Sequence, residues 1–402
     1  MSFGAPLSPT AIGAMAQALS HRGPDDEGYV ALQGQGDALR VTPLRGPVST
    51  IQDLPFLTEF AGGARLYLGH RRLAILDLSP AGHQPMAYGD HLWIVFNGEI
   101  YNYVELREEL KAAGYEFSTG TDTEVILAAY DRWGEGCVTR FNGDWAFAIL
   151  DTQRRVLFLS RDRYGIKPLY FVRGDDSFAF ASEIKALFSL PSVPRSLNPE
   201  KALQYLALFC RDHTEETLFD GIYQLRPGES LRIDLQTGQL WRWLYYTPTC
   251  SPELGAYDHR KALAYAADIR DLLFDAVRLR LRADVPVGTC LSGGLDSSVV
   301  VAIMAELLRR DGHTAGPRTF TAVYPGEAID ESAFARLAAQ QAGASSHFVY
   351  PSREGYWQTL PTLLYYQDEP FGGPSAYAQW EVMREVSRHV KVVLDGQGGD
   401  EV

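Results

Sequence analysis

Short apolar runs separated by turn residues dominate the first two hundred residues. The runs are rich in Leu, Ile and Val and are bounded by Gly, Pro or Asp, which is typical of strands in packed sheets. We expect strands at 65–70, 73–78, 91–96, 145–151, 155–162, 168–172 and 178–182. Two segments, 103–113 and 123–133, instead place apolar residues at helical spacing among charges. Asp122 is the candidate N-cap of the second helix and Gly134 its stop.

The pattern changes after residue 255. Residues 261–282 form an amphipathic segment with Ile269, Leu273 and Val277 on one face. Strands and helices then alternate, which predicts a parallel α/β sheet. We expect strands at 285–291, 318–324, 347–350 and 390–394 and helices at 297–310, 331–342 and 356–366.

The sequence therefore predicts two domains. The first spans 1–209, a bridging segment spans 210–255, and the second domain spans 256–402. The last residues follow a glycine-rich turn directly after an expected strand. We interpret this ending as a C-terminally incomplete second domain.

Composition and charge narrow the function class. The 402 residues include 37 basic and 50 acidic side chains, and a net charge of −13 argues against binding nucleic acid by phosphate neutralisation. No apolar run is long enough for a membrane span, and the N-terminus lacks a secretory pattern. The cysteines show no zinc-ligand spacing and are too sparse for a disulfide framework, which predicts a reduced, cytoplasmic protein. They are Cys137, Cys210, Cys250 and Cys290.

The sharpest chemical signal is CLSGGLDSS at 290–298. An expected strand ends there, two glycines turn the backbone, and a helix begins. Glycines let backbone N–H groups approach an anion, and a helix N-terminus favours negative charge. We expect a phosphate-binding loop, with the serine hydroxyls as further donors. The alternative is a Ser/Gly-rich helix cap without a ligand.

Acidic residues next to this loop indicate a metal. A carboxylate beside a phosphate requires a cation between them, so Asp296 is a candidate Mg²⁺ ligand. A second glycine-rich turn, DGQGGDE at 395–401, follows another apolar strand and supplies Asp400 as the second candidate. The alternative for this second run is a plain surface turn.

Four further blocks precede these motifs in the sequence. They are HRGPDDEG at 21–28, GHRRLAILD at 69–77, FNGEIYN at 96–102 and GTDTE at 120–124. With SGGLDSS, and in this order, they make nearly the whole chain resemble the glutamine-hydrolysing asparagine synthetases. The resemblance implies a two-domain protein of α/β and α+β class. An αββα sandwich of the N-terminal-nucleophile type, the glutamine amidotransferase domain, is followed by a parallel-sheet α/β domain resembling the adenine-nucleotide alpha-hydrolases.

The same resemblance implies a reaction. ATP activates the aspartate side chain as β-aspartyl-AMP, and ammonia from glutamine converts it to asparagine, with release of AMP and pyrophosphate. The implied cofactors are ATP and Mg²⁺, and the implied partners are glutamine or ammonia and aspartate or another carboxylate. No nucleic acid or membrane partner is expected, and a homodimer stays open.

Residue roles are carried over from the family by motif. Arg72 would bind the glutamine α-carboxylate, Glu99 and Asp122 the α-ammonium, and Asn97 with the Gly98 N–H would form the oxyanion hole. A solvated strand residue, a helix cap and a hairpin turn are the alternatives for Arg72, Asp122 and Asn97–Gly98. The residues implied to bind ATP are Leu291, Ser292, Gly293, Gly294, Asp296, Ser297, Ser298, Ala322, Asp395 and Gly396.

The sequence departs from the family at two points. The family's nucleophile is an N-terminal cysteine on a short apolar strand, and here Met1 is followed by Ser2 and Phe3. Two interpretations stay open: the chain lacks its first strand, or the protein has lost glutaminase activity and uses free ammonia. Gln397 stands where the family has a catalytic glutamate, and an amide cannot act as a general base. A related carboxyl-activating ligase of the β-lactam synthetase type and a non-catalytic nucleotide-binding protein therefore remain alternatives.

Overall fold

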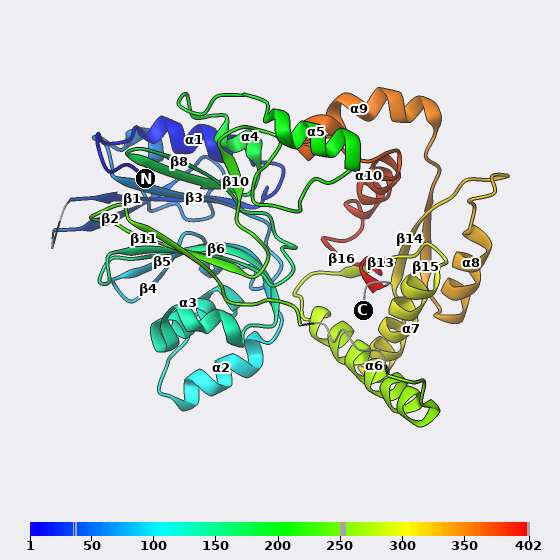
Figure 1. Ribbon diagram of the computed structural model, residues 1–402. Coiled ribbons are helices and arrows are strands. Elements are labelled where there is room, and N and C mark those ends of the chain that lie inside the picture. Colours follow the sequence, from blue (N-terminus) through cyan, green and yellow to red (C-terminus); the bar gives the residue numbers. More distant parts are fainter. Residues whose placement is uncertain (35, 37, 250–254, 400–402) are drawn as a thin grey trace. The chain divides into compact units, whose positions relative to one another are not determined.

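The computed structural model describes residues 1–34, 36, 38–249 and 255–399, in two compact units, Met1–Thr249 and Cys250–Val402 (Figure 1). Residues 210–249, expected as part of a bridge, belong to the first unit. There, β10 (Ile222–Gln224) pairs with β8 (Tyr170–Gly174), and β11 (Glu229–Asp234) pairs with β7 (Val156–Arg161). The compact unit therefore extends to residue 249, because these strands bury apolar side chains in the same core.

The first unit contains a six-stranded sheet in the order β12-β11-β7-β6-β5-β4 and two three-stranded sheets, β2-β1-β3 and β10-β8-β9. The remaining strands are β1 (Asp26–Gln33), β2 (Arg40–Arg45), β3 (Leu66–Arg72), β4 (Met86–Tyr88), β5 (Leu92–Ile100), β6 (Gly143–Asp151), β9 (Ser177–Ala181) and β12 (Leu240–Leu244). The helices are α1 (Pro9–Ala18), α2 (Tyr103–Ala112), α3 (Asp122–Trp133), α4 (Ile184–Leu187) and α5 (Pro199–Leu208).

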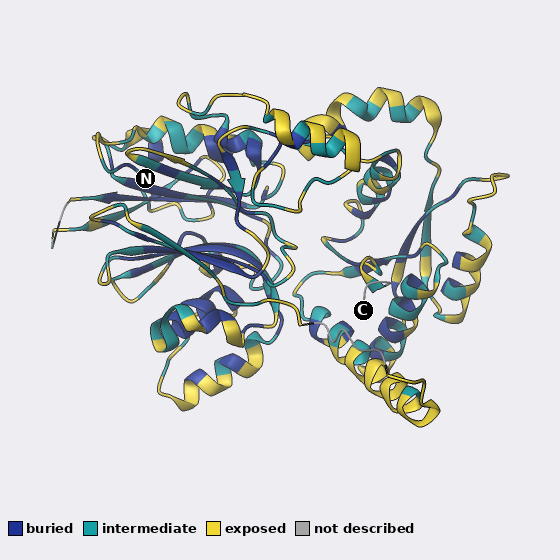
Figure 2. Ribbon diagram, in the orientation of Figure 1, coloured by how far each residue is buried: buried dark blue, intermediate teal, exposed yellow. Residues whose placement is uncertain are grey.

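These elements form four layers. Val30 and Leu68 of one sheet and Val95 and Ala148 of the other belong to one apolar core between the sheets. A second core joins the six-stranded sheet to α2 and α3, and smaller clusters involve α1 and α4 on the far side. Figure 2 shows the sheets and α3 as largely buried and the outer face of α2 as exposed. The expected αββα arrangement is confirmed.

The structure differs from the expected secondary structure at two places in the first unit. Residues 73–78, expected as a strand, form no helix or strand, and two of their carbonyls accept hydrogen bonds from the buried Arg72. The N-cap of α3 is Thr121, whose Oγ1 accepts a hydrogen bond from the Glu124 N–H at 3.2 Å. Asp122, expected as the cap, is instead the first helical residue.

The second unit contains a parallel sheet in the order β15-β14-β13-β16, as expected. Its strands are β13 (Val287–Cys290), β14 (Arg318–Ala322), β15 (Ser345–Val349) and β16 (Val392–Leu394). Its helices are α6 (His259–Arg280), α7 (Leu295–Arg310), α8 (Ser332–Gln341), α9 (Arg353–Gln367) and α10 (Ser375–Val386). Helices α6, α7 and α8 and helix α10 contribute to separate apolar clusters with the strands.

The strand order of this sheet defines a place for a ligand. From β13 the chain builds outward through β14 and β15 on one side, and then returns to β16 on the other. The loops after β13 and β16 therefore leave the carboxyl edge where the order reverses. In open α/β sheets, ligands bind in the crevice at such a switch point. The first glycine-rich turn and residues 395–399 of the second lie in these two loops.

Two further expectations concern the whole chain. None of the helices in the described ranges combines the length and apolar character needed to cross a bilayer. Cys137, Cys210 and Cys290 are free thiols, and Cys250 lies outside the described residues. The cytoplasmic location stays a prediction.

Two candidate functional sites

The HRGPDDEG block supports the end of strand β3. Asp26 pairs with Arg72 across the antiparallel β1–β3 ladder, and the Asp25 N–H donates to the Arg72 carbonyl at 3.0 Å. A Cβ on Gly23 would lie 2.2 Å from the Arg71 carbonyl carbon, so only glycine fits this approach. The block therefore fixes the position from which Arg72 projects.

The loop that follows β3 surrounds the Arg72 guanidinium. Its Nη1 donates to the Ser79 carbonyl at 3.0 Å, and its Nη2 donates to the carbonyls of Leu76 at 3.2 Å and Asp77 at 2.5 Å. A Cβ on Gly82 would lie 1.9 Å from Nη2. Burial lowers the pKa of Arg72, while neighbouring aspartates act in the opposite direction. The side chain is thus a buried, oriented cation and not a solvated strand residue.

Strand β5 carries the Asn97–Gly98 pair. A Cβ on Gly98 would lie 2.1 Å from the Asp144 carbonyl oxygen of the neighbouring strand β6, so a side chain cannot be accommodated there. The Asn97 Nδ2 is buried and has no hydrogen-bond partner among the described residues. An amide donor in this state is available to a ligand oxygen.

Asp122 is held at the start of α3. Its Oδ2 accepts a hydrogen bond from the Ile100 N–H at 2.8 Å, which ties the helix to the end of β5. The residue is 5 % exposed, and this burial raises the pKa of the carboxyl to about 6. Asp122 is consequently a carboxylate near neutral pH and a carboxylic acid at mildly acidic pH.

One cavity of about 460 Å³ collects all the residues that the sequence assigned to glutamine. These are Arg72, Asn97, Gly98, Glu99 and Asp122. His70, Gln84 and Ser182 are among the further lining residues that were not predicted. Burial lowers the pKa of His70 to about 3, so its imidazole is neutral at physiological pH. The place of His70 in the GHRR run at 69–72 is the sequence signal that could have identified it.

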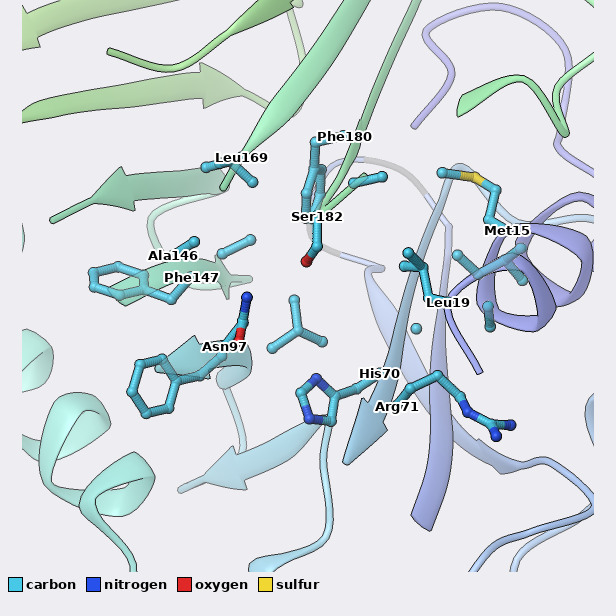
Figure 3. Close-up of a pocket in the computed structure, with 17 residues that line it drawn as sticks. Met15, Leu19, His70, Arg71, Asn97, Ala146, Phe147, Leu169, Phe180 and Ser182 are labelled. Carbon is cyan, nitrogen blue, oxygen red and sulfur yellow. The ribbon is translucent and has the colours of Figure 1, made fainter. Parts of the chain in front are cut away.

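The cavity continues between the sheets. Figure 3 shows this inner space, of about 80 Å³, with Asn97, His70 and Ser182 at its polar side and Met15 and Phe180 among its apolar lining. The residues that line both spaces include His70, Asn97 and Ser182. Among the described residues that line them, no side chain is a thiol.

A further cavity of about 140 Å³ lies between β3 and β9. Met1 lines it, and the Met1 amino group donates to the Phe178 carbonyl at 2.8 Å. Burial lowers the pKa of this amino group to about 5. The Ser2 N–H donates to the Arg65 carbonyl, so the first residues run between the edges of the two three-stranded sheets.

In the second unit, hydroxyl groups shape the loop after β13. The Gly294 N–H donates to Ser292 Oγ at 3.1 Å, and Ser297 Oγ donates to the Gly294 carbonyl at 3.3 Å. The two hydroxyl oxygens are 2.9 Å apart and share a hydrogen bond in which either can be the donor. Both hydroxyls therefore take part in hydrogen bonds within the loop, and backbone N–H groups are further donors available to an anion.

Those N–H groups belong to the first turn of α7. The first helical bond runs from the Ser298 N–H to the Gly294 carbonyl, so the N–H groups of Leu295, Asp296 and Ser297 precede it. Gly293 has a φ of 100°, and a Cβ there would lie 2.7 Å from the Glu331 carbonyl oxygen.

The second glycine turn packs against this helix start. A Cβ on Gly396 would lie 2.8 Å from the Ser297 nitrogen, and one on Gly399 would lie 2.8 Å from the Asp296 carboxyl carbon. Burial and Asp395 together raise the pKa of Cys290 to about 12. The structure thus brings together the two loops that the sequence paired, while Asp400 lies outside the described residues.

Three further predicted site residues, Leu291, Ala322 and Gln397, lie near the carboxyl ends of strands β13, β14 and β16. The Leu291 N–H already donates to the Phe320 carbonyl at 2.9 Å, and the Leu291 carbonyl accepts from Thr321 Oγ1 at 2.7 Å. Ala322 is half-buried at the end of β14. The exposed Gln397 donates its N–H to Asp395 Oδ1 at 3.1 Å.

Comparison with known proteins matches both units to families. Residues 59–244 match the Glutamine amidotransferase domain family, and residues 268–402 match the Asparagine synthase family. A putative asparagine synthetase [glutamine-hydrolyzing] 2 of Methanocaldococcus jannaschii is 34 % identical over 418 residues, covering 100 % of this chain and 73 % of the relative. Asparagine synthetase [glutamine-hydrolyzing] 1 of Bacillus subtilis is 34 % identical over 403 residues.

The chain is shorter than these relatives. The match to the Bacillus subtilis protein covers 99 % of this chain and 56 % of that protein. Among solved structures, a glutamine phosphoribosylpyrophosphate amidotransferase from B. subtilis has a TM-score of 0.46 and 17 % identity, over 86 % of this chain and 80 % of that one. The near-complete alignment to the Methanocaldococcus jannaschii relative shows that the chain belongs to the glutamine-hydrolysing asparagine synthetase family.

Proposed function

We propose that the protein is an ATP-dependent, amide-forming ligase of the asparagine synthase (glutamine-hydrolysing) type. The aspartate side-chain carboxylate attacks the α-phosphorus of ATP, so a C–O–P bond forms and the bond to pyrophosphate breaks. Ammonia then displaces AMP from β-aspartyl-AMP, giving asparagine and a proton. Glutamine is the proposed source of the ammonia.

One observation carries this proposal: two glycine turns meet at the switch point of the parallel sheet. The N–H groups at the start of α7 face a loop with an exposed Ser292 and half-buried Gly293 and Gly294, so backbone donors are accessible to an anion. Such preorganised donors stabilise charge that develops on a leaving pyrophosphate. The Walker A pattern, which ends in Gly-Lys followed by Ser or Thr, is absent from this loop.

The donor set at this loop fits Mg²⁺. The Asp296 carboxylate lies at the start of α7, and the close approach of Gly399 leaves backbone rather than a side chain beside it. Asp296 would hold the ion together with Asp400 and phosphate oxygens, as hard cations prefer. When bound, Mg²⁺ would neutralise negative charge on the phosphate oxygens. Asp395 and Gly396 would border the same site.

The cavity of the first unit supports a glutamine-binding role. Arg72 offers a buried cation for the α-carboxylate, and Asp122 with Glu99 offers carboxylates for the α-ammonium. The buried Nδ2 of Asn97 and the N–H of Gly98 would stabilise the oxyanion formed at the amide carbon. Because ammonia itself displaces AMP in the proposed reaction, we expect ammonium chloride to serve as a nitrogen donor as well.

Exchange of labelled pyrophosphate into ATP tests the proposal. We expect exchange that depends on aspartate and Mg²⁺, and that falls by at least about 100-fold in Asp296→Asn. Asp311→Asn, at the opposite end of α7, is the matched control and should retain exchange.

Two outcomes would contradict the proposal. Exchange with another carboxylic acid but not with aspartate would identify a related carboxyl-activating ligase. Binding of Mg·ATP without exchange in the presence of any acid would identify a non-catalytic nucleotide-binding protein. The homodimer stays a prediction that mass measurement in solution will decide.

A further inference from the structure

Three metal-ligating side chains converge in the second unit, away from the glycine turns. His347 lies on β15, Glu385 lies near the end of α10, and His389 lies in the link between α10 and β16. Their donor atoms all lie within 4.8 Å of one another. We propose that His347, Glu385 and His389 form a zinc-binding site.

The distances support a shared ion. The Glu385 Oε1 lies 2.9 Å from His389 Nε2 and 3.8 Å from His347 Nδ1. Ligands around a tetrahedral zinc, with bonds of about 2.0–2.2 Å, are separated by about 3.3–3.5 Å. Opening the shorter distance and closing the longer one by a few tenths of an ångström would bring both to this separation.

The surrounding contacts hold the ligands in place. Phe320 stacks on the His347 ring at a centroid distance of 5.0 Å, and the two imidazole rings are 4.0 Å apart. Arg318 Nη1 donates to the His389 carbonyl at 2.9 Å, which fixes the backbone of that ligand. Glu385 and His389 are four residues apart in the sequence, and their side chains are in direct contact at the end of α10.

The carboxylate has one oxygen available for the ion. Arg388 Nη1 lies 2.8 Å from Glu385 Oε2, which leaves Oε1 directed at the two imidazoles. The donor set is therefore two imidazole nitrogens and one carboxylate oxygen. This combination suits zinc, whereas Mg²⁺ prefers oxygen ligands alone.

The site is open to solvent on one side. The exposed fractions of the three side chains are 25 % for His347, 21 % for Glu385 and 31 % for His389. A fourth coordination position can consequently hold water. A bound ion would connect β15 to the α10–β16 link, so its expected effect is on the stability of the second unit.

Titration with ZnCl₂ tests the site. The full chain, freed of metal with a chelator, should bind one Zn²⁺, and Co²⁺ should give the visible absorption of a tetrahedral complex. Glu385→Gln and His347→Gln should each weaken Zn²⁺ binding by at least about 100-fold. His313→Gln, an exposed histidine outside the cluster, is the matched control.

A stability measurement separates binding from folding defects. Zn²⁺ should raise the melting temperature of the wild-type chain and of His313→Gln, but not that of Glu385→Gln. Should His347→Gln fail to fold, His389→Gln gives the same test. Absence of stoichiometric Zn²⁺ binding, or unchanged affinity in the folded ligand variants, would overturn the proposal.

Discussion

Buried ionisable groups define the first site at the scale of single residues. Arg72 is 6 % exposed and Asp122 is 5 % exposed, and removing such charges from water is unfavourable unless hydrogen bonds compensate. Backbone carbonyls surround the guanidinium, and the Ile100 N–H binds the carboxylate. The chain thus holds both charges where a zwitterionic ligand would replace the lost water.

Glutamine affinity should depend on the ionisation of Asp122. Burial raises its pKa to about 6, and only the carboxylate attracts an α-ammonium. Calorimetric titration should therefore show weaker binding as the pH falls below about 6, by about tenfold per pH unit. Asp122→Asn should bind weakly at every pH. An unchanged affinity between pH 5 and 7 would contradict the role of this carboxylate.

Gly98 should not tolerate a side chain. Gly98→Ala places a methyl group against the Asp144 carbonyl oxygen, at 2.1 Å before relaxation. Forcing β5 and β6 apart should cost about 1–3 kcal/mol of unfolding free energy and weaken glutamine binding. Differential scanning calorimetry measures the first effect. Gly136→Ala is the control, because no atom lies within 4 Å of its Cβ, and a loss equal to that of Gly98→Ala would refute the steric argument.

At the scale of elements, the serines of the SGGLDSS motif determine the backbone conformation of the loop between β13 and α7. The hydroxyls of Ser292 and Ser297 bond to each other and to Gly294. Their function in the free protein is therefore to hold the backbone in a conformation that leaves the first N–H groups of α7 accessible.

Ser297→Ala should weaken Mg·ATP binding without unfolding the second unit. The substitution removes the hydroxyl that bridges Ser292 and Gly294, so the loop loses its preorganisation. The expected loss is about tenfold in affinity, which corresponds to about one hydrogen bond. Fluorescent-nucleotide titration measures it, with Ser375→Ala, an exposed hydroxyl on α10, as control. Equal affinities for both variants would show that the hydroxyls do not shape the site.

Hydrophobic periodicity predicted the helices and strands that bury one clear apolar face or one apolar run. Helices α6 and α7 and the strands of the parallel sheet were expected within a few residues, because each has a clear apolar face or an apolar run. The expected strand at 73–78 was wrong because its apolar side chains lie in a loop around Arg72. Helix α1 was missed because its small residues give little contrast between its faces.

Strand β1 was not predicted, because it begins with two acidic residues. The strand starts inside the HRGPDDEG block. Asp26 and Glu27 are nevertheless buried, because His83 Nδ1 lies 2.8 Å from Asp26 Oδ2 and Arg71 Nη1 lies 2.8 Å from Glu27 Oε2. Such partners are distant in sequence, so a single chain gives no signal for them. The same reason explains why Gln84, which accepts the Phe96 N–H, was not predicted at the site.

At the scale of the whole molecule, the two proposed activities lie in separate compact units. All residues expected to contact glutamine belong to Met1–Thr249, and all those expected to contact ATP belong to Cys250–Val402. Each unit has its own apolar clusters. Each ligand should therefore stabilise only the unit that binds it.

Calorimetry of the full chain should show this separation. Glutamine should raise the melting temperature of the first unit alone, and Mg·ATP that of the second unit alone, because each ligand stabilises the state that binds it. Asp296→Asn should abolish the Mg·ATP shift and leave the glutamine shift intact. A single transition that both ligands shift equally would contradict the assignment of one ligand to each unit.

The products formed from ATP test the central claim most directly. The chain would be incubated with Mg·ATP, aspartate and ammonium chloride, and the nucleotide products separated by chromatography. Carboxylate adenylation at the loop after β13 predicts AMP and pyrophosphate in a ratio of one to one with asparagine. Formation of ADP and phosphate, or of AMP in amounts that do not depend on aspartate, would contradict the account.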